Sequence, residues 1–294
     1  MVKKILATLE NYLFVLPALL LFAVFSVYPF FKIFQLSVFE WDAISPMMKF
    51  VGVAQFKHVI FHNVHWWQSV WHATYITILA LTVQNALALG LALAVDRGIR
   101  GGDVYRVIFY LPPVLSGIAV GLIWDWIFNG SYGMFNHWLT NLHLGHLTRA
   151  WLAEPNTALT CVAVIHMWKG FGWGFVILLA GLQSIPRVLY EAADVDGASG
   201  WHKFIHVTVP LMIPVLVLVM ILTILGTMQI YDLIVSTTRG GPGYHTEVPV
   251  TRILFHMTKE SKFGYACAQG IIFGIILLFV SLTQIKLSKK MRQA

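Results

Sequence analysis

The sequence predicts an all-α integral membrane protein with six transmembrane helices. The chain of 294 residues is 58% hydrophobic and only 11% charged, whereas soluble domains carry about 25% charged residues. So apolar a chain cannot cover itself with polar surface, which argues against a water-soluble globule. Lipid offers no partners to the backbone, so a span needs roughly 20 consecutive apolar residues in a helix. Six stretches of the chain meet that length.

The six predicted spans form one transmembrane domain over residues 1–294. Each contains at most one charge, and the charged residues are Lys32, Asp125, Lys169 and Asp232. The first stretch is too long for the apolar core of a signal peptide, and no A-x-A-like cleavage site follows it, so we expect it to be retained. The predicted spans cover residues 12–34, 70–95, 107–128, 159–182, 211–233 and 263–285.

The basic residues indicate how the spans are oriented. Six spans place both termini on one side, and the segments on that side have the higher density of Lys and Arg, including Lys3, Lys4, Arg97 and Arg100. By the positive-inside rule both termini are cytoplasmic. The net charge of +7 therefore reflects orientation in a membrane, and we expect no nucleic-acid partner.

Sequence signatures of enzymes and motors are missing. The chain has no G-x-x-x-x-G-K-[ST], no H-E-x-x-H and no C-x-x-C. We therefore expect no catalytic residue, no nucleotide site and no cofactor in this chain. Cys161 and Cys267 both fall within spans and are expected to be buried, inert thiols.

Three histidines leave a metal site as an alternative. His58, His62 and His65 recur at i, i+4 and i+7, so on a helix they would share one face. Phe56, Phe61 and three tryptophans surround them, as in the aromatic belt of a helix at the membrane surface. We favour the surface helix and predict no metal.

The segment 183–206, between the fourth and fifth spans, is the most informative. Ser184 is expected to cap a helix that has Pro186 in its first turn. Gly197 stands where a left-handed stop is expected, and Ser199 can cap a second short helix. The sequence thus predicts a helix, a glycine turn and a second helix, which either dock onto another protein or simply connect two spans.

The motif Glu191-Ala192-Ala193-x-x-x-Gly197 closely resembles the EAA loop of permease subunits in binding-protein-dependent ABC importers. Phe50-Val51-Gly52, Arg106-x-x-x-x-Leu111-Pro112, Gly133-Met134-Phe135-Asn136 and Gly240-Gly241-Pro242 extend the resemblance over nearly the whole chain. Within that group, the chain resembles more specifically the sugar and glycerol-phosphate permeases of the maltose-transporter type.

The resemblance implies a type I ABC importer permease (MetI-like) fold in the bacterial inner membrane. It implies as partners a second permease, two cytoplasmic ATPase subunits that bind ATP and Mg, an external solute-binding protein and a carbohydrate substrate. The EAA loop would contact an ATPase through residues Glu191, Ala192, Ala193, Asp194, Gly197 and Ala198.

Polar and aromatic residues inside the spans are candidates for the solute path, because burying polar groups against lipid is costly. Each polar one could instead form an interhelical hydrogen bond, and the glycines at 170 and 174 could serve close helix packing. The candidates are Gln84, Asn85, Trp168, Lys169, Phe171, Trp173, Gln229, Tyr231 and Asp232.

One alternative class remains open. Asp125, near the outer end of the third span, could serve as a proton or ion relay in a self-contained secondary transporter or channel. Such a protein would transport without ATP or partners.

Overall fold

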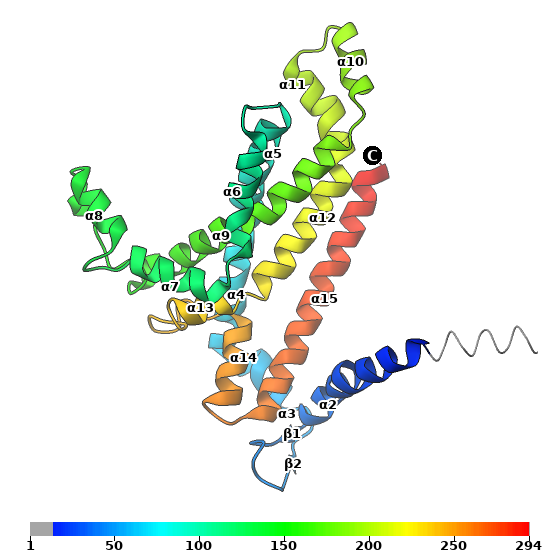
Figure 1. The fold of residues 1–294 in the computed structure, drawn as a ribbon. Helices are drawn as coiled ribbons and strands as arrows, with labels where there is room; N and C mark the ends of the chain where they lie inside the picture. The colour runs from blue at the N-terminus through cyan, green and yellow to red at the C-terminus, as the bar shows by residue number, and fades with distance from the viewer. Residues whose placement is uncertain (1–13, 294) are drawn as a thin grey trace, which may run out of the picture. The chain divides into compact units, whose positions relative to one another are not determined.

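A computed structural model describes residues 14–293 (Figure 1). The first two residues of the predicted first span, and Lys3 and Lys4, lie outside the described residues. The described part of the chain is mostly helical, with one two-stranded antiparallel ribbon in which Phe39 pairs with Phe50. The strands are β1 (Phe39–Glu40) and β2 (Lys49–Phe50).

The helices include three π-helical segments (η1, η2 and η4) and one short 3-10 turn (η3). In chain order they are η1 (Ala23–Val27), α2 (Tyr28–Leu36), α3 (Ala54–His62), α4 (Val64–Leu79), η2 (Ala80–Gln84), α5 (Asn85–Asp96), α6 (Gly102–Val114), α7 (Gly117–Ile127), α8 (Met134–Asn141), η3 (Gly145–Leu147), α9 (Pro155–Gln183), α10 (Arg187–Val195), α11 (Gly200–Lys203), η4 (Phe204–Thr208), α12 (Val209–Met228), α13 (Asp232–Ser236), α14 (Pro249–Thr258) and α15 (Phe263–Gln293).

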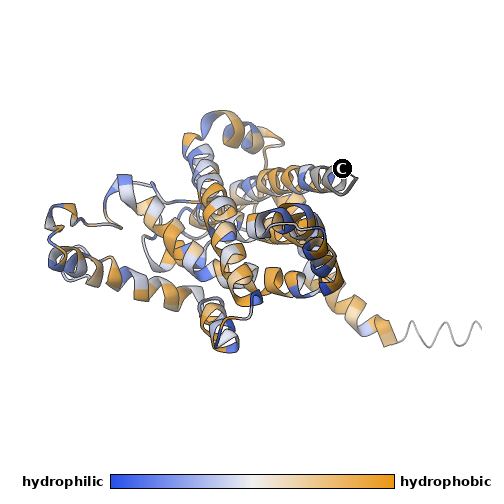
Figure 2. Cartoon of the chain, turned by 90° about the horizontal axis from the view of Figure 1, so that it is seen from above, coloured by the Kyte–Doolittle hydropathy of each residue, from blue (hydrophilic) through white to orange (hydrophobic). Residues whose placement is uncertain are grey.

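Within the described part of the chain, five uninterrupted helices are long and apolar enough to cross a membrane. They are Phe14–Leu36, Val64–Asp96, Pro155–Gln183, Gly200–Met228 and Phe263–Lys286. They correspond to the predicted first, second, fourth, fifth and sixth spans. The first is hydrophobic on nearly all sides (Figure 2), and no residue in its most apolar stretch is buried within the chain. Such a helix requires lipid or a partner around it.

The third predicted span is not one straight helix. The helices Gly102–Val114 and Gly117–Ile127 are long and apolar enough to cross a membrane only when taken together, and their axes meet at 96°. Leu115 and Ser116 are extended between them, and the Ser116 side chain caps α7 by accepting a hydrogen bond from the amide of Ala119. The chain therefore has five spans, or six if this bent pair counts as one.

The chain divides into two compact units. The first comprises the described residues up to 63 together with 253–276, and the second comprises 64–252 together with the residues from 277 onward. In the first unit, Gln55 donates a hydrogen bond to the carbonyl of Phe39 at 2.7 Å. A Cβ on Gly264 would overlap that same carbonyl, so α15 begins in close contact with the ribbon.

The second unit has its core where α5, α9 and α12 lie side by side. Small residues of α5 face large ones of α9, as in tightly packed membrane helices. The buried cluster consists of Ala88, Ala92, Val95, Phe175, Leu178, Leu179, Leu182, Ile185, Met212 and Val219.

Candidate functional site

The predicted coupling loop forms a helix pair at one end of the second unit (Figure 1). Ser184 does not cap the first helix as expected. It ends α9, donating its hydroxyl to the carbonyl of Gly181 at 2.7 Å, and α10 begins at Arg187 after Pro186. Pro186 is the N-cap of α10 and so stands one position before the first turn in which it was expected, and no side chain caps this helix.

Gly197 makes the turn as predicted. Its φ of +74° is left-handed, and the amide of Ala198 reaches back to the carbonyl of Ala193 at 2.9 Å, which closes the end of α10. Ser199 caps the following helix through the amide of His202. That helix is not the separate short one that was expected, because it continues from Gly200 to Met228 as the fifth span.

Apolar side chains project from this helix pair. Val195 is 89% exposed and Trp201 is 67% exposed, beside the exposed Glu191 and Ala192. Ala193 is half-buried, and Asp194 forms an ion pair with Lys203 at 2.6 Å. Exposed apolar groups gathered with charges on a small projecting unit are typical of a protein-docking surface.

A polar seam connects the second span to the fifth. The hydroxyls of Thr77 and Thr227 lie 2.7 Å apart, and Thr223 donates to the Oδ1 of Asn85 at 3.1 Å. The sequence analysis singled out Asn85 and missed the three threonines, because a threonine within an apolar span carries little polar signal. Gln84 lies in η2 against Gly170, and its Oε1 is buried without a partner.

The aromatic candidates of α9 do not converge on one cavity. Trp168 packs edge-on against Trp124 at 5.6 Å, and Phe171 packs against Phe109 at 6.1 Å. Trp173 contacts Tyr110 and is 54% exposed. Lys169, the residue after Trp168, is half-buried. The rings therefore fasten α9 to α6 and α7.

The three candidates at the end of the fifth span lie outside its helix. The prediction that this span extends to residue 233 is wrong, because α12 ends at Met228 and Gln229 is its cap. Gln229 and Tyr231 are exposed. Asp232 opens α13, a short helix that packs on α7, where a Cβ on Gly117 would overlap the Asp232 carboxylate.

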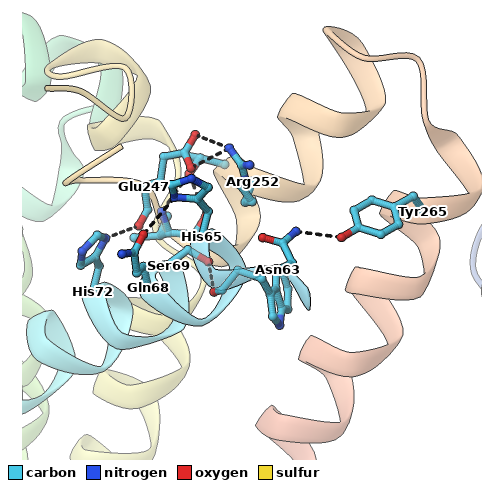
Figure 3. A network of polar contacts seen from close by, with 11 residues as sticks. Asn63, His65, Gln68, Ser69, His72, Glu247, Arg252 and Tyr265 are labelled. Atoms are coloured by element: carbon cyan, nitrogen blue, oxygen red, sulfur yellow. Dashed lines mark hydrogen bonds and ion pairs between the residues drawn. The ribbon is translucent and has the colours of Figure 1, made fainter. Parts of the chain in front are cut away.

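A second polar network holds the segment that follows Gly240-Gly241-Pro242 against α4 (Figure 3). The Arg252 guanidinium pairs with the Glu247 carboxylate at 3.1 Å, both side chains being less than 10% exposed. The Glu247 carbonyl lies 2.8 Å from Nδ1 of His72, and Arg252 lies over the Tyr244 ring. Burial raises the pKa of Glu247, and the charges of Arg252 and His65 oppose the shift.

The three histidines singled out in the sequence are not brought together. In the described residues, no group of three or more His, Cys, Asp or Glu side chains is placed to hold an ion. His58 and His62 stack at 5.9 Å, and His58 contacts the hydroxyl of Tyr265 at 3.0 Å, which also accepts from Asn63. His65 belongs to the second unit and lies 2.9 Å from Gln68.

Asp125 borders an open recess of about 380 Å³ in the second unit, with Phe128, Asn129, Thr237 and Thr238 among its lining residues. The Asp125 side chain is exposed within this single chain. Cys161 and Cys267 are free thiols, the first buried and the second half-buried.

Comparison with known proteins gives matches over the whole chain. Residues 86–293 match the family of binding-protein-dependent transport system inner membrane components. A probable ABC transporter permease, YurN of Bacillus subtilis (strain 168), is 31% identical over 280 residues, which cover 95% of each chain. The trehalose/maltose transport system permease MalF of Thermococcus litoralis is 30% identical, covering 95% of this chain and 93% of MalF.

Solved structures show the same fold. A bacterial alginate ABC transporter, crystallised in complex with an alginate pentasaccharide-bound periplasmic protein, contains a chain that superposes with a TM-score of 0.86. The match covers 99% of this chain and 98% of that one at 20% identity.

Proposed function

Since the chain belongs to the family of binding-protein-dependent transport system inner membrane components, we propose that it is the membrane-spanning permease subunit of an ATP-driven carbohydrate importer. The observation that carries the proposal is the full-length similarity, at about 30% identity, to permeases named for sugar transport. One of these relatives is a trehalose/maltose permease and another is a multiple sugar-binding transport system permease.

The chain receives its energy by contact, because its sequence has no phosphate-binding loop of its own. ATP and Mg bind to two partner ATPase subunits, and a second permease completes the translocation path. The α10–Gly197–α11 pair is the part that docks on an ATPase. Its exposed apolar residues, Val195 and Trp201, support this assignment because they lack cover within the described chain.

In this proposal both termini and the coupling loop lie on the cytoplasmic side of the inner membrane, as the distribution of basic residues indicates. An external solute-binding protein delivers the sugar to the opposite side. ATP binding and hydrolysis in the docked ATPases then move the coupling loop, and the attached spans rock between outward-open and inward-open states as rigid bodies.

The solute path belongs to the second unit. Its polar candidates are Gln84, Asn85, Lys169, Gln229, Tyr231 and Asp232, and Gln84 and Asn85 each have a buried polar atom that makes no hydrogen bond within the described residues. A passing sugar hydroxyl would satisfy such an atom. Loss of transport with retained ATPase stimulation in Trp173→Ala or Gln229→Ala would support this path, and unchanged uptake in both variants would remove it.

The test uses the complete transporter, reconstituted in proteoliposomes with its binding protein. ATP hydrolysis is measured against a panel of sugars for the wild type, for Gly197→Asp and for Gly98→Asp. Both glycines have left-handed φ, +74° and +79°, and open space around a Cβ, so the two variants carry equal backbone strain. We expect only Gly197→Asp to abolish sugar-stimulated hydrolysis. Normal transport by that variant would contradict the coupling role, and uptake by this chain alone without ATP would establish a self-contained transporter instead.

A further inference from the structure

Helix α10 is tied to the base of the fifth span by two side-chain contacts that bypass the Gly197 turn. Near the start of α10, the Tyr190 hydroxyl lies 2.9 Å from the hydroxyl of Thr208. Near its end, the Lys203 ammonium donates to the Asp194 carboxylate at 2.6 Å. Each contact joins the segment before the glycine to the segment after it.

Tyr190 also anchors α10 to the membrane core. Its ring packs against the buried cluster formed by α5, α9 and α12, while its hydroxyl reaches Thr208, which is 5% exposed. A tyrosine placed in this way uses its apolar body for packing and its polar tip for one directed hydrogen bond. The contact therefore fixes the orientation of α10 as well as its position.

The partners of both contacts belong to one rigid element. Lys203 is the last residue of α11 and Thr208 the last residue of η4, and the helix runs without interruption from Gly200 to Met228. A displacement of that helix at its base would therefore be carried along the fifth span. The Gly197 turn alone would not transmit such a displacement, because a glycine with open space around it permits many backbone angles.

We propose that Tyr190–Thr208 and Asp194–Lys203 form a clasp that makes α10 and the fifth span move as one body when the ATPase moves. This inference rests on the proposed function. It assigns Asp194 as a positioning residue, which acts through Lys203 on the angle of α10. The resemblance to the EAA loop had placed the same residue among the ATPase contacts.

The decisive measurement is the number of sugar molecules transported per ATP hydrolysed, in proteoliposomes that contain the complete transporter and saturating binding protein. The variants are Asp194→Lys, Lys203→Asp and the double variant that exchanges the two charges. Asp103→Lys is the matched control, because Asp103 pairs with Arg106 at 3.2 Å and is well exposed, but lies outside the coupling loop.

Each single variant places like charges opposite one another. We expect it to lower the transport-to-ATP ratio about two- to fivefold, which corresponds to the strength of a partly exposed ion pair. The exchanged pair restores the attraction and should return the ratio to the wild-type value. A residue that only contacted the ATPase would not be rescued by a change at position 203, so rescue separates positioning from contact. The control should keep the wild-type ratio.

Tyr190→Phe tests the second contact, because it keeps the ring packing and removes only the hydroxyl. It should lower the ratio in the same direction while the complex still assembles. The clasp is refuted if the single charge variants keep the wild-type ratio, or if the exchanged pair assembles without rescue. Those outcomes leave the proposed function intact, whereas a wild-type complex without sugar-stimulated ATP hydrolysis refutes the proposed function itself.

Discussion

Gly172 in α9 is the position where the packing of the second unit makes its sharpest quantitative prediction. A Cβ there would overlap the backbone carbonyl of Phe109 and lie 2.7 Å from a ring carbon of Pro113, both on α6. Neither neighbour is the end of a flexible side chain, so Gly172→Ala must separate the two helices. Gly174, two residues further along the same helix, provides the control, because a Cβ there would meet the Cβ of Ala88 at an ordinary 3.4 Å.

The two substitutions should therefore change the free energy of unfolding in opposite directions. Overpacking costs about 1–3 kcal/mol, and the rigid neighbours of Gly172 place it at the upper end of that range. Replacing Gly by Ala within a helix returns about 1 kcal/mol, so we expect Gly172→Ala to lose about 2 kcal/mol net. Gly174→Ala should leave the stability unchanged or raise it by up to about 1 kcal/mol, a difference between the variants of about 30- to 160-fold in the unfolding equilibrium.

The assay is denaturant unfolding of the purified permease in micelles, followed by tryptophan fluorescence. Gly90→Ala in α5, where a Cβ would meet nothing within 4 Å, measures the helix-propensity gain alone. Equal free energies of unfolding for the variants at 172 and 174 would show that α6 and α9 are not packed as closely as the structure has them.

Two further predictions concern the polar contacts and use the same assay. Arg252→Met leaves the buried Glu247 carboxylate without its ion-pair partner and should cost about 3–5 kcal/mol at neutral pH. Burial raises the pKa of Glu247 above its ordinary 4.5, which means that the folded protein is stabilised when this carboxyl group is protonated. That stabilisation is complete below pH 4.5 and is lost as the pH rises through the pKa of the folded state. The deficit of Arg252→Met should accordingly be smaller at pH 4.5 than at pH 8, and a deficit independent of pH would contradict this account. Thr227→Val removes the 2.7 Å contact with Thr77 and should cost about 0.6 kcal/mol, the average for interhelical hydrogen bonds in a membrane. Thr82→Val, at an exposed position on the second span, should cost less.

The spans could be predicted from hydropathy because each requires an unbroken apolar run, but their breaks could not. Pro112 and Pro113 lie in α6 close to a 96° bend, whereas Pro214 lies within a helix that runs on from Gly200 to Met228. What differs is the surrounding structure. Ser116 supplies a cap that starts a new helix after Pro112 and Pro113, and the π-helical segment η4 precedes Pro214. A proline removes a donor in both cases, and only the neighbouring residues decide whether the helix ends.

The end of the fifth span was hidden for a different reason. The segment around Ile230 and Leu233 is as apolar as a span, so hydropathy continues the helix through it. In the structure the chain turns at Gln229, and α13 lays Asp232 and Ser236 onto two glycines of α7, one turn apart. That turn depends on a tertiary contact between segments more than 100 residues apart in the chain, which no local pattern encodes.

The predicted coupling loop was the most predictable part of the site, because a glycine turn followed by a serine cap is a local arrangement. What the local pattern could not give is the continuity of its second helix with the fifth span. That continuity changes the role of α12, since the helix that begins at the Gly197 turn also carries Thr223 and Thr227, the residues that bind the second span through Asn85 and Thr77. A displacement applied at the clasp would therefore reach the polar seam along a single helix, and it would act on the second span, where Gln84 and Asn85 each have a buried polar atom that makes no hydrogen bond within the described residues.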